Sequence, residues 1–499
     1  MKTKKVLIIG IDALDSLTLK KLSNRLPTFS RLMNNSNISF DGVFPPDSPT
    51  SWASIYTGLN PARHGILLFI DPLKRVSTMI TQDVDDSSIR KRTFWDIAGN
   101  SGKKVIVLPH LLGYPPWDVN GLMIGRSGIK KDVQIRSSYQ ISDINLDDFA
   151  WTISLYPGRN KEKYVRLAKS QLKKEFELGK KLMREFDWDL FFISFGELDP
   201  IQYAYWHFYD KNDSCYPGPN KYQDVIPQFY QMYDMIVGNL MKLAGNDCCT
   251  IVVSDHGIGS RPTKLFNINE VLRRNGFLKE SDKNRISNKK LLKSLILRTV
   301  GNLDLTDFAA LMLKKFPVGK DWFITNERID WEKTVSYLTD QSGIKNYPYG
   351  GILINKSVLQ DLEYEIVRDK IISIFSSIID PTDGKPIFKW IERREKLYEG
   401  EFIEKYPDIL FEMRDDYGAG MDLSKDIFDH SLSHKIVPGC HKQHNATFLL
   451  SDMEIDLPAQ VRMNLMDVTP TILDILGVKT NIQFDGSSII SQNEGFNLL

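Results

Sequence analysis

Long apolar runs are absent from this chain of 499 residues, and cysteines are few. No uncharged apolar stretch reaches the roughly 18 residues of a membrane-spanning helix, so no membrane span is expected. The four cysteines form no CxxC pair and no disulfide framework, and we expect reduced thiols in a cytoplasmic protein. The apolar run after the N-terminal lysines is too short for a secretory leader, so none is expected.

A charge excess of either sign is also lacking. The formal net charge is +1, which gives no overall field that attracts a nucleic-acid polymer or a membrane surface. Apolar residues make up 42% and charged residues 25%, an ordinary globular composition. The length exceeds one small core, so we expect one large domain with insertions, or two domains. Any partner must be recognised at a local site.

Short, fully apolar runs alternate with helical patterns along the chain. Such runs, when each ends in a polar residue, predict a parallel sheet covered by helices on both faces. We therefore predict an α/β fold with a mostly parallel central sheet, whose ligand-binding edge lies at the carboxyl ends of the strands. The predicted strands cover residues 5–11, 104–108, 122–124, 189–195, 249–254 and 447–450, and a long charged helix covers 160–186.

Residues 261–399 differ in character from the rest. They include a basic, polar stretch at 279–297 and a short amphipathic helix at 306–316. We interpret 261–399 as a cap or insertion region with some core elements, and 1–260 with 400–499 as the catalytic core. Near the C-terminus, a helix within 466–477 is expected, with Thr469 as its N-cap.

Acidic residues follow three of the predicted strands, and one of them has a histidine beside it. Asp12, Asp199 and Asp255 stand at or just past strand ends, where their side chains can meet, and His256 follows Asp255 directly. A neighbouring carboxylate and imidazole can bind one cation, although an Asp–His pair also occurs in simple turns. Asp12 has an alternative role as the N-cap of the next helix.

Hydroxyl side chains are concentrated at the predicted start of a helix near Pro49. Ser48, Thr50 and Ser51 lie there, where backbone N–H groups and the helix dipole favour a phosphoryl anion. Helix capping is the alternative reading. His441, in a predicted loop, is a further candidate, although a lone loop histidine is usually incidental.

Nine short segments that include these candidate residues follow one another along the chain. They are GIDALD at 10–15, LPTFSRLM at 26–33, SPTSWASIYTGLNPARHGI at 48–66, FGELD at 195–199, SDHG at 254–257, IDWEKT at 329–334, YPDILFEM at 406–413, GCH at 439–441 and DVTPTILDILG at 467–477. Each segment alone is weak, but the ordered set is specific and covers nearly the whole chain. In this order, the segments resemble the alkaline phosphatase superfamily, in particular its type I phosphodiesterase/nucleotide pyrophosphatase branch and uncharacterised prokaryotic relatives.

The resemblance implies an alkaline-phosphatase-like fold and two divalent metal ions, zinc or manganese. It assigns one metal to Asp12, Asp255, His256 and the nucleophile, and the other to Asp199, His441 and one more histidine. Ser48 falls where this branch carries its nucleophile, with Thr50 as second choice. The implied substrate is a small phosphorylated molecule, and Arg126 is a candidate substrate-binding residue on its charge alone.

Two positions depart from the family pattern. Relatives carry a histidine four residues after the aspartate matched to Asp199, whereas this chain has Tyr203. Tyr203 as a phenolate, or His207 from a re-registered helix, would have to replace that ligand, so the second metal site is expected to be weaker. Phe69 stands where nucleotide pyrophosphatases have an asparagine that holds a phosphoryl oxygen.

The expected function is hydrolysis of a phosphomonoester or phosphodiester through a phosphoryl-serine intermediate. One alternative is a phosphomutase or phosphotransferase with the same nucleophile and metals. The other is a catalytically inactive relative that binds metal or ligand, which the tyrosine at position 203 would suit.

Overall fold

The computed structural model describes residues 5–35, 38–69, 83–141, 144–151, 153, 160–281, 329–339, 346–359, 363–423, 426–451 and 461–490. The helix predicted at 306–316 lies outside the described residues, as does most of the basic stretch at 279–297. Among the described helices, none is both long enough and apolar enough to cross a membrane.

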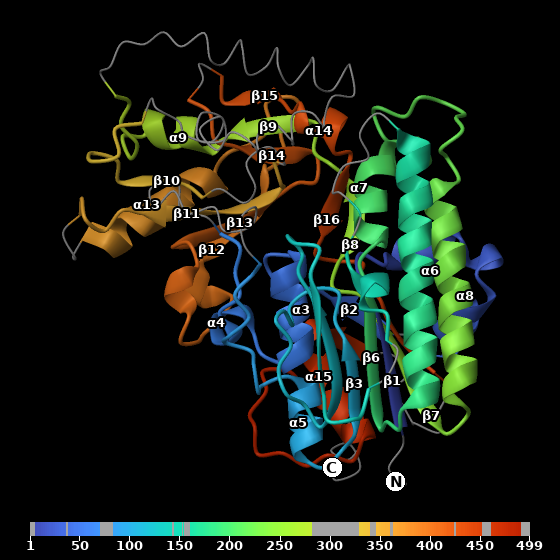
Figure 1. Ribbon diagram of the computed structural model, residues 1–499. Helices are drawn as coiled ribbons and strands as arrows, with labels where there is room; N and C mark the ends of the chain where they lie inside the picture. The colour runs from blue at the N-terminus through green and yellow to red at the C-terminus, as the bar shows by residue number, and fades with distance from the viewer. Residues whose placement is uncertain are drawn as a thin grey trace, which may run out of the picture.

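A seven-stranded sheet forms the centre of the larger body (Figure 1). Five strands are parallel, in the order β7-β1-β6-β3-β4, and an antiparallel strand closes each edge, β17 beside β7 and β5 beside β4. This confirms the predicted mostly parallel α/β sheet. The strands are β1 (Lys5–Ile11), β3 (Val105–Leu108), β4 (Gly121–Arg126), β5 (Val133–Ser137), β6 (Leu190–Phe195), β7 (Cys248–Val253) and β17 (Phe448–Leu450).

Helices cover both faces of this sheet. Leu7 and Ile9 of β1 pack into one apolar cluster, and Val6 and Ile8 pack into another, because successive side chains of a strand point to opposite faces. The first face is covered by α1 (Ser16–Lys21), α2 (Pro27–Asn35), α6 (Lys161–Glu185), α7 (Leu198–Tyr209) and α8 (Val225–Ala244). The second is covered by α3 (Ser48–Thr57), α5 (Phe94–Asn100) and α15 (Val468–Ile475), and α4 (Pro61–His64) follows α3.

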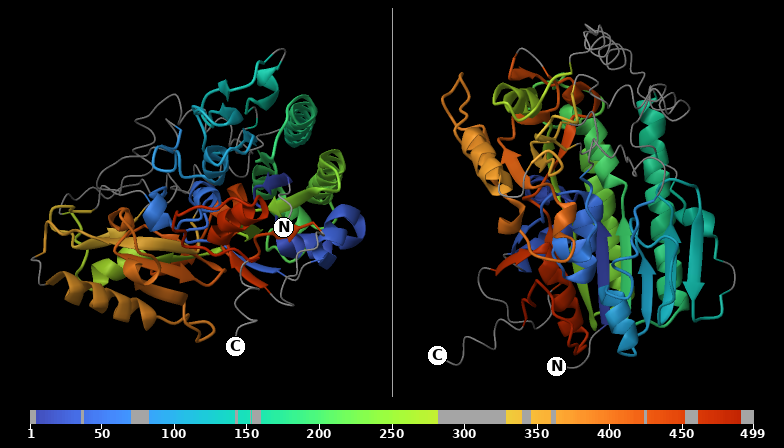
Figure 2. Two further views of the ribbon diagram at one scale, coloured as in Figure 1. Left: turned by 90° about the horizontal axis from the view of Figure 1, so that it is seen from below. Right: turned by 90° about the vertical axis from the view of Figure 1, so that its left-hand side faces the viewer.

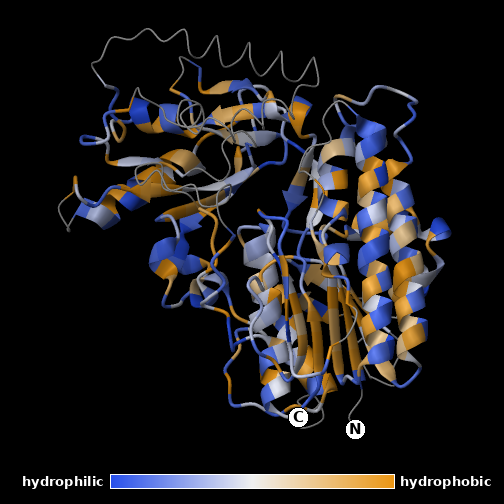
Figure 3. Ribbon diagram, in the orientation of Figure 1, coloured by the Kyte–Doolittle hydropathy of each residue, from blue (hydrophilic) through white to orange (hydrophobic). Residues whose placement is uncertain are grey.

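Hydropathy follows this layering. The central strands are apolar along their length, whereas α6 and α8 mix apolar and hydrophilic residues (Figure 3). That mixture is typical of helices with one face on a core and the other in water.

A second body packs above the carboxyl end of the sheet, as Figure 1 and the right-hand view of Figure 2 show. The apolar cluster of this second body includes residues from Phe266 to Leu423. It therefore extends past position 399, where the sequence predicted the cap region to end. The domain boundaries themselves stay a prediction. Its elements are α9 (Ile268–Arg274), α13 (Tyr364–Ser376), the antiparallel sheet of β10 (Ser336–Leu338), β11 (Tyr349–Ile354), β13 (Ile409–Met413) and β12 (Phe388–Arg393), and the sheet of β14 (Tyr417–Gly420), β9 (Lys264–Asn267) and β15 (Phe428–His430).

Short elements connect the two bodies. β8 (Gly257–Ser260) continues from the end of β7 and pairs antiparallel with β16 (Gly439–Lys442), which follows the short helix α14 (Ser433–Ile436). A separate parallel pair joins β2 (Ile38–Asp41) to β18 (Val461–Asn464). The β8–β16 pair places two parts of the chain that are distant in sequence at the same edge of the central sheet.

The predicted N-cap roles of Asp12 and Thr469 are wrong. Asp15 caps α1 instead, because its Oδ1 accepts a hydrogen bond from Thr18 N–H at 2.7 Å. A 3-10 turn at Leu465–Asp467 precedes α15, so that helix begins before Thr469, whose hydroxyl donates to Ile55 O at 2.7 Å. Asp12 is therefore available for another role.

Candidate active site

Polar side chains collect at the carboxyl edge of the central sheet. Asp12 directly follows β1, and Asp255 stands two residues past β7. Asp199 lies in the first turn of α7, just after β6, and His110 stands two residues past β3. Parallel strands bring these four positions to one edge, which is where the sequence predicted a shared site.

Asp12, Asp255 and His256 form one buried cluster whose ligand atoms lie within 4.8 Å of one another. His256 Nε2 is 3.3 Å from Asp255 Oδ2 and 3.5 Å from Asp12 Oδ1. Those two carboxylate oxygens are buried and accept no hydrogen bond from the described residues. His256 Nδ1 is 3.0 Å from Gly257 O, and a carbonyl only accepts, so Nδ1 carries the proton and Nε2 faces the carboxylates.

The two buried carboxyl groups of this cluster lie close together, and this favours binding of a cation. Burial raises the pKa of the Asp255 carboxyl to about 7, and the nearby Asp12 carboxylate acts in the same direction. Burial also acts to raise the pKa of Asp12, but the hydrogen bond from His110 and the charges of both histidines outweigh it, and the net shift is downward. A bound cation would neutralise the negative charge of these two buried carboxylates.

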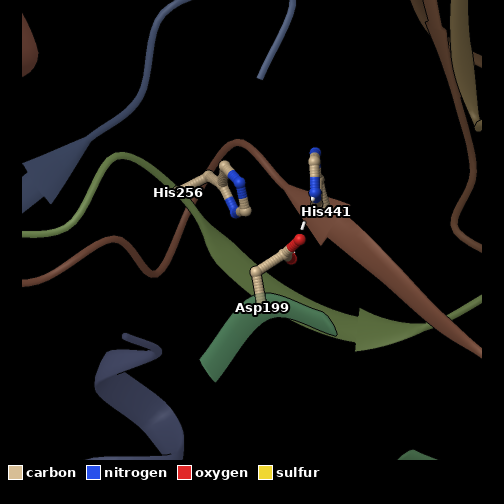
Figure 4. Close-up of side chains that lie close together, drawn as sticks. All are labelled: Asp199, His256 and His441. Atoms are coloured by element: carbon tan, nitrogen blue, oxygen red, sulfur yellow. Dashed lines mark ion pairs between the residues drawn. The ribbon is translucent and has the colours of Figure 1, made fainter. Parts of the chain in front are cut away.

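Asp199, His256 and His441 form a second cluster (Figure 4). His441 Nε2 is 3.3 Å from Asp199 Oδ1, while His441 Nδ1 is 2.9 Å from Pro46 O and therefore donates to it. The rings of His256 and His441 stack with centroids 3.7 Å apart. His256 thus belongs to both clusters and links them.

Ser48 begins α3 and lies beside this junction. Its Oγ is 3.1 Å from His256 Nε2. The side chain is partly exposed, whereas Thr50 and Ser51 are fully buried in the first turn of the helix, and their hydroxyls have no hydrogen-bond partner among the described residues. Of the three candidate nucleophiles, Ser48 is the one whose hydroxyl lies within hydrogen-bond distance of the candidate metal ligand His256.

His110 is a site residue that the sequence analysis missed. Its Nε2 lies 2.8 Å from Asp12 Oδ2, and because a carboxylate only accepts, His110 donates to Asp12. Its Nδ1 is 2.8 Å from Ser194 Oγ, and its backbone N–H donates to the same oxygen at 2.8 Å. The signal available in the sequence was its position just past the predicted strand at 104–108.

The two substitutes for the absent histidine are placed differently. Tyr203 is buried, its hydroxyl lies 3.0 Å from that of Tyr347, and burial raises its pKa well above 10. A phenolate ligand is therefore disfavoured. His207 is not among the ligand atoms grouped around Asp199, and it lies near Asp213 and His434, whose charges influence its pKa.

Two further predicted positions take part in packing. Phe69 lies in an aromatic group, with its ring centroid 6.5 Å from Phe44 and 5.8 Å from Tyr406. The Arg126 guanidinium is buried, pairs with the Glu175 carboxylate, and donates to His110 O at 3.2 Å. A substrate-binding role for Arg126 stays a prediction, and its observed partners are internal.

The donor chemistry of the two clusters fits divalent metal ions. Carboxylate oxygens and imidazole nitrogens are suitable ligands for zinc and manganese. His256 and His441 each donate Nδ1–H to a backbone carbonyl and present Nε2 to carboxylates, the arrangement that orients metal-binding histidines. Among the described residues, the second cluster has Asp199 and His441 as its own candidate ligands and shares His256 with the first.

This α/β protein, with carboxylates, imidazoles and a helix-terminal serine at the carboxyl edge of its sheet, is a phosphoric ester hydrolase. The sequence matches the type I phosphodiesterase/nucleotide pyrophosphatase family over residues 6–418. The chain belongs to that family, whose members are metal-dependent phosphoric ester hydrolases. A comparison with curated protein sequences finds no match.

Solved structures of low sequence identity share the fold. Human ectonucleotide pyrophosphatase/phosphodiesterase 5 is 14% identical with a TM-score of 0.52, and the match covers 98% of this chain and 99% of that one. The murine protein, in an inactive form with AMP, is 15% identical with a TM-score of 0.50 over 98% and 99% of the two chains. Phosphonoacetate hydrolase from Sinorhizobium meliloti 1021, in complex with phosphonoformate, is 13% identical with a TM-score of 0.53 over 95% and 96%.

Proposed function

We propose that this protein hydrolyses a small phosphate ester through a phosphoryl-Ser48 intermediate, with two divalent metal ions held by the clusters described above. One observation carries the proposal. Ser48 Oγ lies 3.1 Å from His256 Nε2, and His256 belongs to both groups of candidate metal ligands. The proposed nucleophile and both proposed metal positions therefore lie next to the His256 side chain.

In the proposed reaction, Ser48 Oγ forms a bond to phosphorus while the bond between phosphorus and the ester oxygen breaks, and the alcohol leaves with a proton. Water then attacks the phosphoryl-serine, releasing phosphate, or a phosphomonoester when the substrate is a diester, and restoring the hydroxyl. Divalent metals supply Lewis-acid stabilisation of the negative charge and favour the ionised nucleophile. Asp12, Asp255 and His256 would hold one ion, and Asp199 and His441 the other.

Residues of this chain also prepare the site without touching a metal. His110 fixes the Asp12 carboxylate by its hydrogen bond, so that Asp12 loses little freedom when it binds a cation. Ser48 stands at the N-terminus of α3, where the helix dipole and free backbone N–H groups favour a phosphoryl anion.

A pocket beside His441 supplies space for the organic part of the ester. Its wall combines Phe44 and Tyr349 with the basic side chains of Lys389 and Lys442. Lys389 also pairs with Glu412 at 2.8 Å, so its charge is partly balanced within the wall. Asp415 of the same wall pairs with Lys389 at 2.9 Å and with Lys442 at 3.3 Å, so the pocket offers aromatic surface beside balanced charges. Two proteins of similar fold were solved with AMP and with phosphonoformate.

The test compares p-nitrophenyl phosphate with bis-p-nitrophenyl phosphate, using protein stripped of metal and reloaded with zinc or manganese. We expect metal-dependent release of nitrophenol that falls by several orders of magnitude in Ser48→Ala. Thr50→Val serves as the matched control, because Thr50 is buried in the same turn. Acid-quenched reactions should contain phosphoserine at position 48. Full activity in Ser48→Ala, or loss confined to Thr50→Val, would move the nucleophile.

The alternative functions give different products. A phosphomutase or phosphotransferase would pass the phosphoryl group to an added alcohol or sugar phosphate instead of water. A catalytically inactive relative would bind metal at Asp255 and His256, with affinity reduced in Asp255→Asn, but would release no nitrophenol under any metal. Phosphorus NMR of the products separates these outcomes.

A further inference from the structure

Another group of metal-type ligands lies away from the candidate active site. Asp213 and Cys215 stand in the loop after α7, and His434 lies in α14. One ligand atom from each lies within 4.8 Å of the other two. A zinc ion with ligands at about 2.0–2.3 Å holds them roughly 3.5 Å apart, so these atoms need only small movements to bind one ion.

The hydrogen bonding of His434 matches that of the candidate active-site histidines. Its Nδ1 is 2.9 Å from Arg261 O and must donate to that carbonyl, and its Nε2 lies 3.0 Å from Asp213 Oδ1. A carboxylate also only accepts, so this contact needs either a second proton on the imidazole or a cation shared by the two groups. A histidine held by a backbone carbonyl at one nitrogen is the usual arrangement of a metal ligand.

Buried polar atoms at the same place are a second observation that favours a bound ion. Asp213 is 6% exposed, and its other oxygen, Oδ2, is buried without a hydrogen-bond partner among the described residues. Nδ1 of the neighbouring His207 is likewise buried without a partner in the described part of the chain.

We propose that Asp213, Cys215 and His434 bind a structural zinc ion, with water or His207 in the fourth position. One thiolate, one imidazole and one carboxylate form a donor set that suits zinc and is foreign to magnesium or calcium. This site is separate from the clusters around His256, and it does not depend on the proposed reaction.

Such an ion would connect two segments that carry candidate active-site residues. The Asp213–Cys215 loop continues α7, which carries Asp199, and α14 leads into β16, which carries His441. Arg261 already joins these parts, because its guanidinium donates to Val437 O and Gly439 O, both at 2.5 Å, and lies over the ring of Tyr203 in α7, 5.5 Å from its centroid. A zinc ion here would fix α7 against β16 and hold Asp199 close to His441, where the family's usual third ligand is replaced by Tyr203.

The thiolate makes the site testable independently of activity, because the candidate active-site ligands include no sulfur. We would replace bound metal by Co²⁺ in the full chain and record the near-ultraviolet sulfur-to-cobalt charge-transfer band. The band should be present in the wild type and absent in Cys215→Ser. Cys248→Ser is the matched control and should keep the band, because Cys248 is the first residue of β7, at the amino end of the strand. Zinc content should fall by at least one equivalent per chain in Cys215→Ser and His434→Gln, and should be unchanged in Cys248→Ser.

Two results would overturn the proposal. One is an unchanged zinc content in Cys215→Ser together with no cobalt–sulfur band in the wild type, which would make His434 and Asp213 an imidazolium–carboxylate ion pair. The other is a band that persists in Cys215→Ser, which would place the sulfur ligand elsewhere. Ser48→Ala and Asp255→Asn should keep the band, so failure of the proposed hydrolysis leaves this test intact.

Discussion

Replacing Arg126 by methionine tests whether this arginine has an internal role or binds substrate. Its guanidinium pairs with the Glu175 carboxylate, with side chains 1% and 0% exposed. Glu197 is buried nearby, and burial together with the Glu175 charge raises the pKa of its carboxyl well above the usual value. Arg126 is therefore the cation that balances a buried pair of acidic side chains.

The size of the effect follows from this charge balance. Removing one partner of a buried ion pair costs about 3–5 kcal/mol, because the other charge stays buried without compensation. The carboxyl can escape this penalty by taking up a proton, and for a glutamate of pKa about 4.3 that costs roughly 3.7 kcal/mol at pH 7. We therefore expect Arg126→Met to lower the free energy of unfolding by about 3–4 kcal/mol at pH 7.

Urea unfolding at pH 7 and pH 5 measures this change. The variant's carboxyl would have a raised pKa in the folded state, so the folded chain binds more protons than the unfolded chain and its stability falls as pH rises. The loss should therefore be smaller at pH 5. The double variant Arg126→Met/Glu175→Gln should recover much of the stability. A stability change within about 0.5 kcal/mol, with a raised KM for phosphate esters, would refute this reasoning and support substrate binding.

Three other perturbations have expected outcomes. Burial lowers the pKa of His64 to about 3. The stability contributed by this neutral imidazole is therefore complete above pH 6.5 and is lost on acidification towards pH 3, by up to about 1.4 kcal/mol per pH unit. Urea unfolding midpoints measured across this range should vary less with pH in His64→Gln than in the wild type. His110→Ala removes the hydrogen bond to Asp12 and should weaken zinc binding about 10- to 100-fold in a chelator competition. Tyr203→Phe should keep the full metal content but lose about 1 kcal/mol of stability with the hydroxyl contact to Tyr347, whereas a loss of metal would restore Tyr203 as a ligand.

Local sequence pattern was sufficient for the sheet and for much of the site. Each parallel strand is a short apolar run, and the residue that follows it is placed by the sheet itself. For this reason Asp12 and Asp255, 243 positions apart, lie at one edge and share contacts with His256. A helix start is also a local signal, and it gave Ser48, Thr50 and Ser51 as candidates; the family resemblance selected Ser48, whose hydroxyl lies 3.1 Å from Nε2 of the same histidine.

Contacts that depend on long-range packing were not readable. His110 has no motif around it, and only the pairing of β3 with β6 brings it to Ser194 and near Asp12. His434 and Asp213 are 221 positions apart and come together through α14 and the loop after α7. The sequence allowed His207 as a replacement ligand for the second metal only if its helix were broken or re-registered, and α7 runs unbroken from Leu198 to Tyr209.

The tyrosine at position 203 links the two metal proposals. In the family pattern a histidine there would reach the same ion as Asp199, but here the side chain is buried against Tyr347 and its ring packs on His441, with centroids 5.0 Å apart. Tyr203 thus supports His441 by packing, while Arg261 holds the strand of His441 through Gly439 O. If the second ion has fewer ligands, its affinity depends on how firmly Asp199 and His441 are held. Removing Cys215 should then weaken metal binding at Asp199 as well, although the two sites share no ligand.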